Sequence, residues 1–444
     1  MSVTIPPIAR LYRACEPNES LAPTDPRFVD FDAARGESPA KRYATSLRRS
    51  DPDRAEIKLF AGHRGIGKTS ELYRLKKLLE EPAGTDNPYR PFTVIYFDVS
   101  QTLDTNDLDF PDLLVFIAGQ VQQQLKDASI PGFTGASQYL ERVWDDAKRL
   151  LGSEVELKGA DAKLPFGKLA LEFKNRPNAR HALRAAIEKL NTSLLGAVND
   201  LLATANVALR NSDQSSGLVL LIDGLDKVAL RPLDDGRSNT HTRLFCDRAD
   251  QLAALHAHTV YTVPISLIYS PRAAQLAQTF GEHPVPVPMI RLRDDRTKPI
   301  SPTGKGMTVL KTIIEKRADF AAVSFNDVFD RPATCHYLCQ MSGGHPRHLM
   351  MFMQAAMNAV DALPITMAAA EKAVRNYANS LSREIPDRFW PALKKFAKPQ
   401  AGIPKDDDHQ GMLFLLHIFE YMNCAPWYEV NPVIRELAGF KSAS

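Results

Sequence analysis

Residues 57–79 read IKLFAGHRGIGKTSELYRLKKLL, a buried-strand pattern that runs into a glycine-rich loop and then into an amphipathic helix. The loop matches GxxxxGK[ST], whose backbone N–H groups cradle phosphates when a strand precedes the loop and a helix follows it. Both flanking elements are expected here. The sequence therefore predicts an α/β fold organised around a phosphate-binding loop.

The loop residues suit the parts of a nucleotide's phosphate chain. Glycines can take backbone angles closed to other residues, so successive N–H groups turn toward phosphate oxygens. Lys68 supplies a mobile charge for the β- and γ-phosphates, Thr69 offers a hydroxyl to Mg²⁺, and the helix N-terminus adds its dipole. We expect ATP and Mg²⁺ as cofactors, since no guanine-reading N/TKxD string follows a core strand. The predicted cofactor-binding residues are Gly62, His63, Arg64, Gly65, Ile66, Gly67, Lys68, Thr69 and Ser70.

A second buried strand ends in an acid. Residues 217–228 read GLVLLIDGLDKV, in which an unbroken apolar run suits a strand covered on both faces. Asp223 falls at the carboxyl end of that run, where the ligand crevice of an open α/β sheet lies. Together with the phosphate loop this is a Walker B pattern, so Asp223 is expected to hold Mg²⁺ through its water shell. Thr69 and Asp223 are the predicted metal residues.

The residues after Asp223 indicate the subclass. Most hydrolytic members of the superfamily place Glu next, whereas this chain has Gly224, then Asp226 and Lys227. The DGLDK string resembles the D-G-x-D-E/D signature of STAND signal-transduction ATPases, relatives of AAA+ and NACHT proteins. The resemblance implies that Asp226 orients water or Mg²⁺, and the alternative is an Asx-type turn cap. Lys227 replaces a frequent acid of the family, which favours a slowly hydrolysing switch over a motor.

Three further segments are expected to be core strands: residues 91–100, residues 258–270, and the proline-containing residues 285–292. In the AAA+-like arrangement the strand at 258–270 lies between the phosphate-loop strand and the Walker B strand. It also carries a polar residue that senses the γ-phosphate. Thr262 and Ser266 are the candidates for this sensor, although both residue types are ordinary in strands.

Residues 342–357, SGGHPRHLMMFMQAAM, resemble the GG-x-P-R-x-L signature at the lid of STAND and origin-recognition-like ATPases. The two glycines are expected to break the preceding helix, and Pro346 to start the next one with Arg347 in its first turn. The resemblance implies that Arg347 is a sensor-2 arginine that reaches the γ-phosphate. The alternative is an ordinary solvated helix residue. The predicted catalytic residues are Lys68, Asp223, Asp226 and Arg347.

The chain is expected to have four parts. Residues 1–56 form an N-terminal arm, of which Phe28, Val29 and Arg35 either contact the base or pack as part of a surface arm. The ATPase core follows at 57–295. The later features are a β-hairpin insertion at 154–174, a long helix at 177–210, a helical lid at 296–384 and a winged-helix-like domain at 385–444.

The winged-helix-like domain is expected to begin with a helix that carries Lys394, Lys395 and Lys398, and to continue with LLHIFEY as a helix before a two-stranded wing turning at 422–425. The wing has no basic residue, and Lys405 precedes an acidic run at 406–408 that would repel phosphate. In STAND proteins, which the chain resembles, this module commonly packs against the nucleotide domain and holds the inactive state, and we favour that role over direct DNA contact.

Composition sets the remaining bounds. The 444 residues carry 55 basic and 52 acidic side chains, a net charge of +3, which gives no bulk attraction to nucleic acid. Five scattered cysteines indicate a reducing cytosol, and neither a secretion signal nor a membrane-spanning run is visible. We therefore expect a cytoplasmic protein.

Two function classes follow. The favoured one is a nucleotide-gated switch that forms homo-oligomers and controls a separately encoded effector, since GHRGIGKTSEL and DGLDK resemble bacterial antiphage ATPases and no effector domain is recognisable. The alternative is a DNA-acting AAA+ ATPase, a loader or transposition-type regulator. A small-molecule phosphotransferase lacks an acceptor-binding motif. Arg243 and Arg248 are candidates for an arginine acting on a neighbouring subunit.

Overall fold

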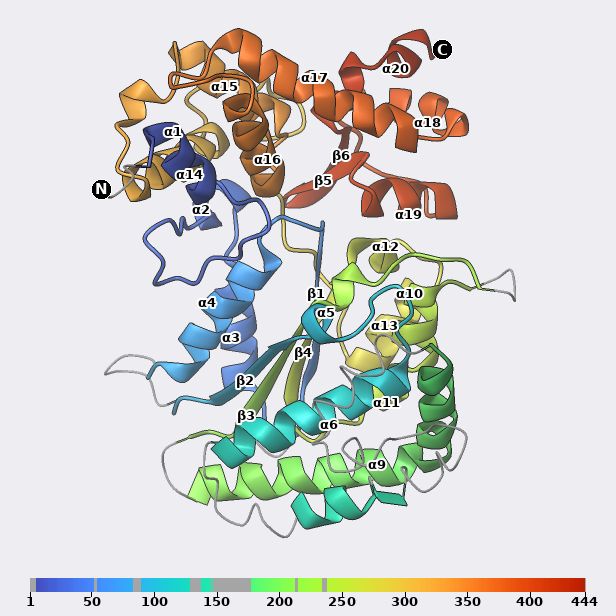
Figure 1. Ribbon diagram of the computed structural model, residues 1–444. Coiled ribbons are helices and arrows are strands. Elements are labelled where there is room, and N and C mark those ends of the chain that lie inside the picture. Colours follow the sequence, from blue (N-terminus) through green and yellow to red (C-terminus); the bar gives the residue numbers. More distant parts are fainter. Residues whose placement is uncertain are drawn as a thin grey trace. The chain divides into compact units, whose positions relative to one another are not determined.

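The computed structural model describes residues 5–51, 54–82, 89–127, 137–143, 145–146, 177–211, 215–233 and 238–443 (Figure 1). The chain divides into two compact units, named here the lid unit and the sheet unit. The lid unit comprises Met1–Ala40, Gly62–Arg74 and Pro286–Ser444, and the sheet unit comprises Lys41–Ala61 and Leu75–Val285. The hairpin predicted at 154–174 lies outside the described residues.

The sheet unit is built on a four-stranded sheet with the order β1-β4-β3-β2. Its strands are β1 (Ile57–Gly62), β2 (Thr93–Asp98), β3 (Leu218–Asp223) and β4 (His258–Pro264). The pairs β2–β3 and β3–β4 are parallel. Every residue of β1, β3 and β4 is buried, as their apolar runs require. The predicted place of the strand at 258, between the phosphate-loop strand and the Walker B strand, is confirmed.

Two strand predictions are wrong in extent or in kind. The segment at 285–292 forms no strand, because Pro286 and Pro288 have no N–H to donate to a ladder. The predicted strand at 258–270 stops at Pro264, and the short helix α12 (Ile265–Ile268) follows at once. Ser266 therefore lies on a helix.

Helices cover the sheet. The long helices α6 (Phe110–Asp127) and α9 (Pro177–Asn211) run side by side, and α6 also packs on β2 (Figure 1). The helix predicted at 177–210 is confirmed as α9. Shorter helical segments are α5 (Val99–Thr102), η3 (Leu225–Lys227), α10 (Thr240–Thr242), η4 (Arg243–Asp247), α11 (Ala249–Ala253) and α13 (Ala273–Phe280). Helices α3 (Pro39–Arg49) and α4 (Lys68–Glu80) contribute residues to both units.

The lid unit is mainly helical. Its elements include α1 (Pro7–Ala14), α2 (Asp32–Arg35), α14 (Lys305–Phe320), η5 (Phe325–Asp327), α15 (Pro332–Met341), α16 (Pro346–Met357) and α17 (Met367–Glu384). Helix α1, from the N-terminal arm, packs against α14 and α16. The predicted break is confirmed, since Gly343 and Gly344 have positive φ, α15 ends before them, and Pro346 opens α16.

The C-terminal part of the lid unit has a winged-helix-like fold. It contains η6 (Asp387–Phe389), α18 (Trp390–Lys395), α19 (Asp407–Phe414), the antiparallel hairpin β5 (Ile418–Asn423) and β6 (Ala425–Val430), η7 (Pro432–Glu436) and α20 (Ala438–Ser442). The prediction that LLHIFEY is helical is wrong. Leu416 takes a positive φ of 63° after α19, and the aromatic and β-branched residues that follow form β5.

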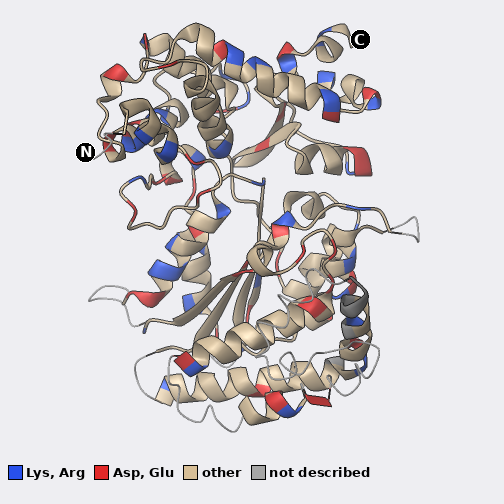
Figure 2. Cartoon of the chain, in the orientation of Figure 1, with Lys and Arg blue, Asp and Glu red and all other residues tan. Residues whose placement is uncertain are grey.

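Figure 2 shows acidic and basic residues interspersed over the helices, with an acidic start to α19. Neither β5 nor β6 contains a Lys or Arg. Within the described ranges, no helix has the length and apolar character needed to cross a bilayer.

Candidate functional site: the phosphate loop and its surroundings

The loop after β1 has the backbone that a phosphate cradle needs. Gly62, Gly65 and Gly67 have φ values of 149°, 90° and 94°. The Lys68 ammonium donates to the carbonyls of Gly62 at 2.8 Å and His63 at 2.7 Å, so the loop is closed around its own lysine. Helix α4 starts at that lysine, which places the predicted Mg²⁺ ligand Thr69 and the neighbouring Ser70 in its first turn.

The N-terminal arm holds the loop from one side. Arg35 of α2 is buried and donates to the Ile66 carbonyl and to the Glu71 carboxylate, each at 2.6 Å. Phe31 lies against the same guanidinium, at 4.9 Å from its ring centroid. Burial raises the pKa of Glu71, and the positive charges of Arg35 and Arg74 oppose that shift. Arg35 was predicted either to contact the base or to pack as part of a surface arm, and in the structure it bonds the loop and the helix behind the loop.

The turn before α16 holds the loop from another side. Gly65 could carry no side chain, because a Cβ there would lie 2.7 Å from His345 Cε1 and 3.2 Å from Arg347 Cβ. His345 Nε2 also bonds the Arg64 carbonyl at 2.8 Å. The lid unit thus brings together the predicted phosphate loop and the predicted sensor arginine. In the sequence, Lys68 of the loop and Arg347 are 279 residues apart.

The hairpin and α19 hold the loop through His63. The ring is buried, its Nδ1 lies 3.2 Å from the Leu413 carbonyl, and its Nε2 accepts from the Glu420 N–H at 2.8 Å. Burial and the nearby Lys68 charge lower the pKa of His63 to about 3. From its sequence position His63 was predicted only as a loop residue, and His345 was given no role, because contacts with distant segments leave no local signal in the sequence.

The predicted Walker B acid stands at the end of β3 in the sheet unit. Asp223 is buried, with Oδ1 accepting from the Gly224 N–H at 2.7 Å and Oδ2 accepting from the Tyr96 hydroxyl at 3.1 Å. Tyr96 was missed, although it precedes Asp98, the β2 residue in register with Asp223. A buried carboxylate of this kind, oriented by a hydrogen bond from a neighbouring hydroxyl, is a suitable oxygen ligand for a hydrated Mg²⁺.

Steric contact explains why the chain has Gly rather than Glu after Asp223. Gly224 has a φ of 87°, and a Cβ there would lie 2.1 Å from Asp98 Oδ1. No glutamate fits at this position. A residue that orients water must then come from further along, and Asp226, buried in η3, is the next acid.

The side chains around Asp226 are tied to the sheet. Lys227 pairs with Asp98 at 3.1 Å and donates to the Ser100 hydroxyl at 2.8 Å. The Thr262 hydroxyl accepts from the Leu225 N–H at 3.2 Å, so this sensor candidate supports the turn that holds Asp226. Lys227 therefore neutralises a carboxylate of β2.

The other candidates have partners within the sheet unit. The Ser266 hydroxyl lies 3.0 Å from Nδ1 of His241, which favours a structural role on α12. Arg243, with a side chain 49% exposed, donates to Asp109 at 2.7 Å, and Arg248 donates to Glu188 at 2.8 Å. Either arginine would have to leave its carboxylate to act on a neighbouring subunit.

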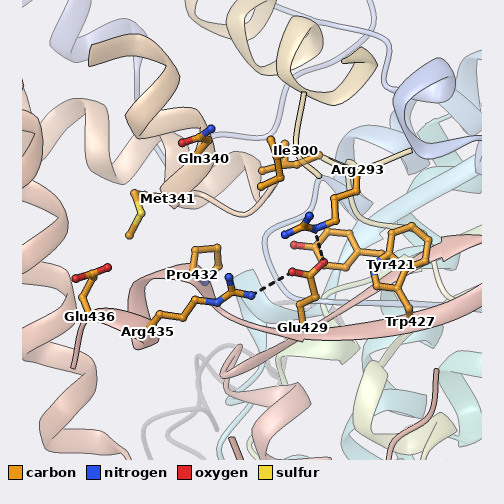
Figure 3. Close-up of a pocket in the computed structure, with 11 residues that line it drawn as sticks. Arg293, Ile300, Gln340, Met341, Tyr421, Trp427, Glu429, Pro432, Arg435 and Glu436 are labelled. Carbon is orange, nitrogen blue, oxygen red and sulfur yellow. Dashed lines mark hydrogen bonds and ion pairs between the residues drawn. The ribbon is translucent and has the colours of Figure 1, made fainter. Parts of the chain in front are cut away.

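A separate cavity of about 230 Å³ lies in the lid unit beside the hairpin. Arg293 and Arg435 approach Glu429 from two sides, at 3.1 and 3.2 Å, and the stacked rings of Tyr421 and Trp427 lie beside them (Figure 3). It contains none of the predicted nucleotide residues. Its two arginines are balanced in formal charge by two glutamates, Glu429 and Glu436.

No protein-family model matches the chain, and no curated protein matches it. Among solved structures the chain is similar to Drosophila ORC bound to DNA, with 9% identity, 97% of this chain and 90% of that chain covered, and a TM-score of 0.39. It is also similar to Cdc6p from Pyrobaculum aerophilum (11%; 97% and 96%; 0.37) and to the Aeropyrum pernix ORC2 protein in ADPNP–ADP complexes (13%; 97% and 95%; 0.35).

With TM-scores below 0.5, the fold assignment rests on the chain's own features. The sheet is parallel where its pairings are defined, β4 lies between β1 and β3, and a glycine-rich loop joins β1 to a helix. A helical segment and a winged-helix-like segment follow. This is an α/β fold of the AAA+ P-loop type.

Proposed function

We propose that the chain is an ATP-binding P-loop ATPase of the AAA+ type that works as a nucleotide-controlled switch. The observation that carries the proposal is the meeting of the phosphate loop with the first turn of α16, where a Cβ on Gly65 would lie 3.2 Å from Arg347 Cβ. A γ-phosphate in the loop would be within reach of the Arg347 guanidinium. A γ-phosphate that contacts both the loop and Arg347 would favour the arrangement in which the loop and α16 lie together.

Hydrolysis is proposed to be slow. Mg²⁺, when bound with Thr69 and Asp223, would neutralise charge on the β- and γ-phosphate oxygens. Asp226 is the proposed residue that orients the attacking water. Asp226 lies three residues beyond the Walker B acid Asp223, in a turn whose Leu225 N–H donates to Thr262, and this position supports a regulatory role more than rapid turnover.

The proposal is tested by Lys68→Ala, which removes the charge that contacts the phosphates. ATP titrated into the wild-type chain in a calorimeter with Mg²⁺ should bind, and the variant should bind at least tenfold more weakly, a difference of about 1.4 kcal/mol or more. Circular dichroism should show the same fold in both. Equal ATP affinity in the two proteins would overturn the phosphate-site assignment.

The target of the switch is a separate proposal. A separately encoded effector, as in antiphage systems, is supported by the GHRGIGKTSEL and DGLDK strings and by a hairpin without Lys or Arg. ATP-driven homo-oligomers would need an arginine from a neighbour, and Arg243 and Arg248 remain the candidates. Light scattering with ATP, with ADP and without nucleotide tests assembly, and an unchanged monomer in all three would refute it.

DNA is the second candidate target, and the winged-helix-like fold at the C-terminus favours it. Lys394, Lys395 and Lys398 on or after α18 are the basic residues that could contact a backbone, whereas Asp406 caps an acidic helix start. Fluorescence anisotropy with a labelled duplex decides this. Binding that weakens with salt and is lost when the three lysines become alanine would establish the DNA-acting alternative.

A further inference from the structure

A histidine outside the phosphate loop sets the direction of one peptide inside it. His345 Nε2 lies 2.8 Å from the Arg64 carbonyl oxygen. In a planar trans peptide, a carbonyl and the following N–H point in opposite directions. Holding the Arg64 carbonyl toward His345 therefore turns the Gly65 N–H to the opposite side. A side chain of the lid turn thus decides which way a phosphate-loop donor points.

The same arrangement recurs two residues later. Arg35 Nη2 donates to the Ile66 carbonyl at 2.6 Å, which turns the Gly67 N–H away from Arg35. Alternate carbonyls of the loop are thus held from outside by two different segments. Such fixed carbonyls leave successive N–H groups free to converge on one anion, which is the geometry of an anion-binding nest.

Only one tautomer of His345 satisfies its neighbours. His345 is the N-cap of α16, and its Nδ1 accepts from the His348 N–H at 3.2 Å. The lone pair is therefore on Nδ1 and the proton on Nε2, which makes Nε2 the donor to Arg64. Burial lowers the pKa of His345 well below its ordinary value, so the ring stays neutral. One ring thus starts the helix and orients the loop.

We propose that His345 is a positioning residue of the phosphate site, which aims the Gly65 N–H at the phosphate oxygens through its bond to the Arg64 carbonyl. This inference rests on the ATP-binding role proposed above and adds the physical link between the loop and the lid helix. If His345 no longer bonds Arg64, the Arg64 carbonyl loses its donor. The peptide can then rotate and present a carbonyl oxygen to the phosphates, which repels them.

The two nitrogens of His345 can be replaced one at a time. His345→Asn places an oxygen near Nδ1, which preserves the N-cap, but its side chain is too short to bond Arg64. His345→Gln places an amide N–H near Nε2, which preserves the bond to Arg64, but loses the cap. Thr366→Ala is the matched control, because Thr366 caps α17 through the Ala369 N–H at 3.2 Å and does not contact the loop.

The test measures ATP affinity by calorimetry and the melting temperature of each variant, with Lys68→Ala alongside. His345→Asn should bind ATP about three- to tenfold more weakly at a nearly unchanged melting temperature, the loss expected for one hydrogen bond. His345→Gln should melt about 2–4 °C lower and bind ATP nearly as the wild type does. Thr366→Ala should melt lower by a similar amount with unchanged affinity.

The outcomes separate the two proposals. If Lys68→Ala binds ATP like the wild type, the proposed function fails. If Lys68→Ala loses binding but His345→Asn does not, the phosphate site stands and the positioning role is wrong. The role is also wrong if affinity follows melting temperature across all the variants.

Hydrogen exchange on the unmodified chain gives a check that needs no variant. ATP should slow exchange in peptides covering 62–67 and in peptides covering 345–350 together, because one ring joins them. Protection of the loop alone would contradict the inference.

Discussion

The buried ion pair between Arg35 and Glu71 allows a quantitative prediction about how the arm supports the phosphate loop. The two side chains are 1% and 5% exposed, and their charged atoms lie 2.6 Å apart. Arg35→Ala leaves the Glu71 carboxylate buried without its closest partner, a change that costs about 3–5 kcal/mol. For a domain of roughly 150–250 residues each kcal/mol lowers the melting temperature by about 2–4 °C, so a fall of about 6–20 °C is expected.

Two further variants show whether the cost arises from the orphaned charge. The double variant Arg35→Met with Glu71→Met replaces the pair with apolar side chains and should recover most of the loss, leaving about 1 kcal/mol for the unpaired Ile66 carbonyl. Lys441→Ala breaks a pair with Glu436 in which both side chains are 60% exposed, and should cost less than about 1 kcal/mol.

The assay is urea unfolding followed by tryptophan fluorescence. Trp390 and Trp427 both belong to the lid unit, and replacing Trp144 by Phe removes the third tryptophan from the signal. All variants are made in that background. The reasoning is refuted if Arg35→Ala unfolds within about 1 kcal/mol of its parent, or if the double variant is as unstable as the single one.

Three other predictions concern turnover, the lid and pH. Asp226→Asn should bind ATP as the wild type does and release phosphate at least tenfold more slowly, and an unchanged rate in a phosphate-release assay would make Asp226 a turn residue only. Arg347→Ala should bind ATP but show no ATP-dependent change in small-angle scattering or oligomer size, whereas a normal response would remove its sensor role. Burial lowers the pKa of His63 and His348 to about 3. Below pH 6.5 these histidines bind protons in the unfolded chain but stay neutral in the folded one. The free energy of unfolding is therefore highest above pH 6.5 and falls as the pH decreases toward 3. Each ring contributes a loss of about 1.3 kcal/mol at pH 5.5 relative to pH 7, and equal urea midpoints at these two pH values would show that the rings are not buried as neutral groups.

Features with a local physical cause could be predicted from the sequence. The unbroken apolar runs of β1 and β3 require burial on both faces, and both strands formed where expected. The glycine pair and proline at 343–346 act through their own backbone angles, so the end of α15 and the start of α16 were predictable. The glycine-rich loop belongs to the same class, since its φ values depend on residue type.

Errors arose where two local preferences compete. LLHIFEY is short and apolar, a pattern that suits either a buried helix or a strand, and the positive φ of Leu416 ends the helix before it. The segment 285–292 has the apolar composition of a core strand, but its prolines remove the ladder donors. In both cases the composition indicated the wrong element, and burial correctly for most of the segment, although Val285 and Leu415 at the starts of the two segments are exposed.

The contacts that surround the candidate site could not be predicted, because they join segments far apart in the chain. His345 bonds a loop carbonyl 281 residues away, His63 accepts from an N–H 357 residues away, and Arg35 reaches the helix 36 residues ahead. No local pattern identifies either partner of such a pair. Only the assembled lid unit does so.

These contacts give the phosphate loop a dependence that its motif does not reveal. A glycine-rich loop has many accessible backbone states, and binding an anion through it costs the entropy of selecting one. Here Arg35 and His345 each fix one loop carbonyl, and His63 anchors the loop to the hairpin. The arm, the lid turn and the winged-helix-like segment therefore restrict the loop to one backbone state before the anion binds. A disturbance in any of the three segments should therefore weaken phosphate binding without touching the motif. By linkage, a bound phosphate should stabilise each segment against unfolding by the same free energy by which that segment strengthens phosphate binding.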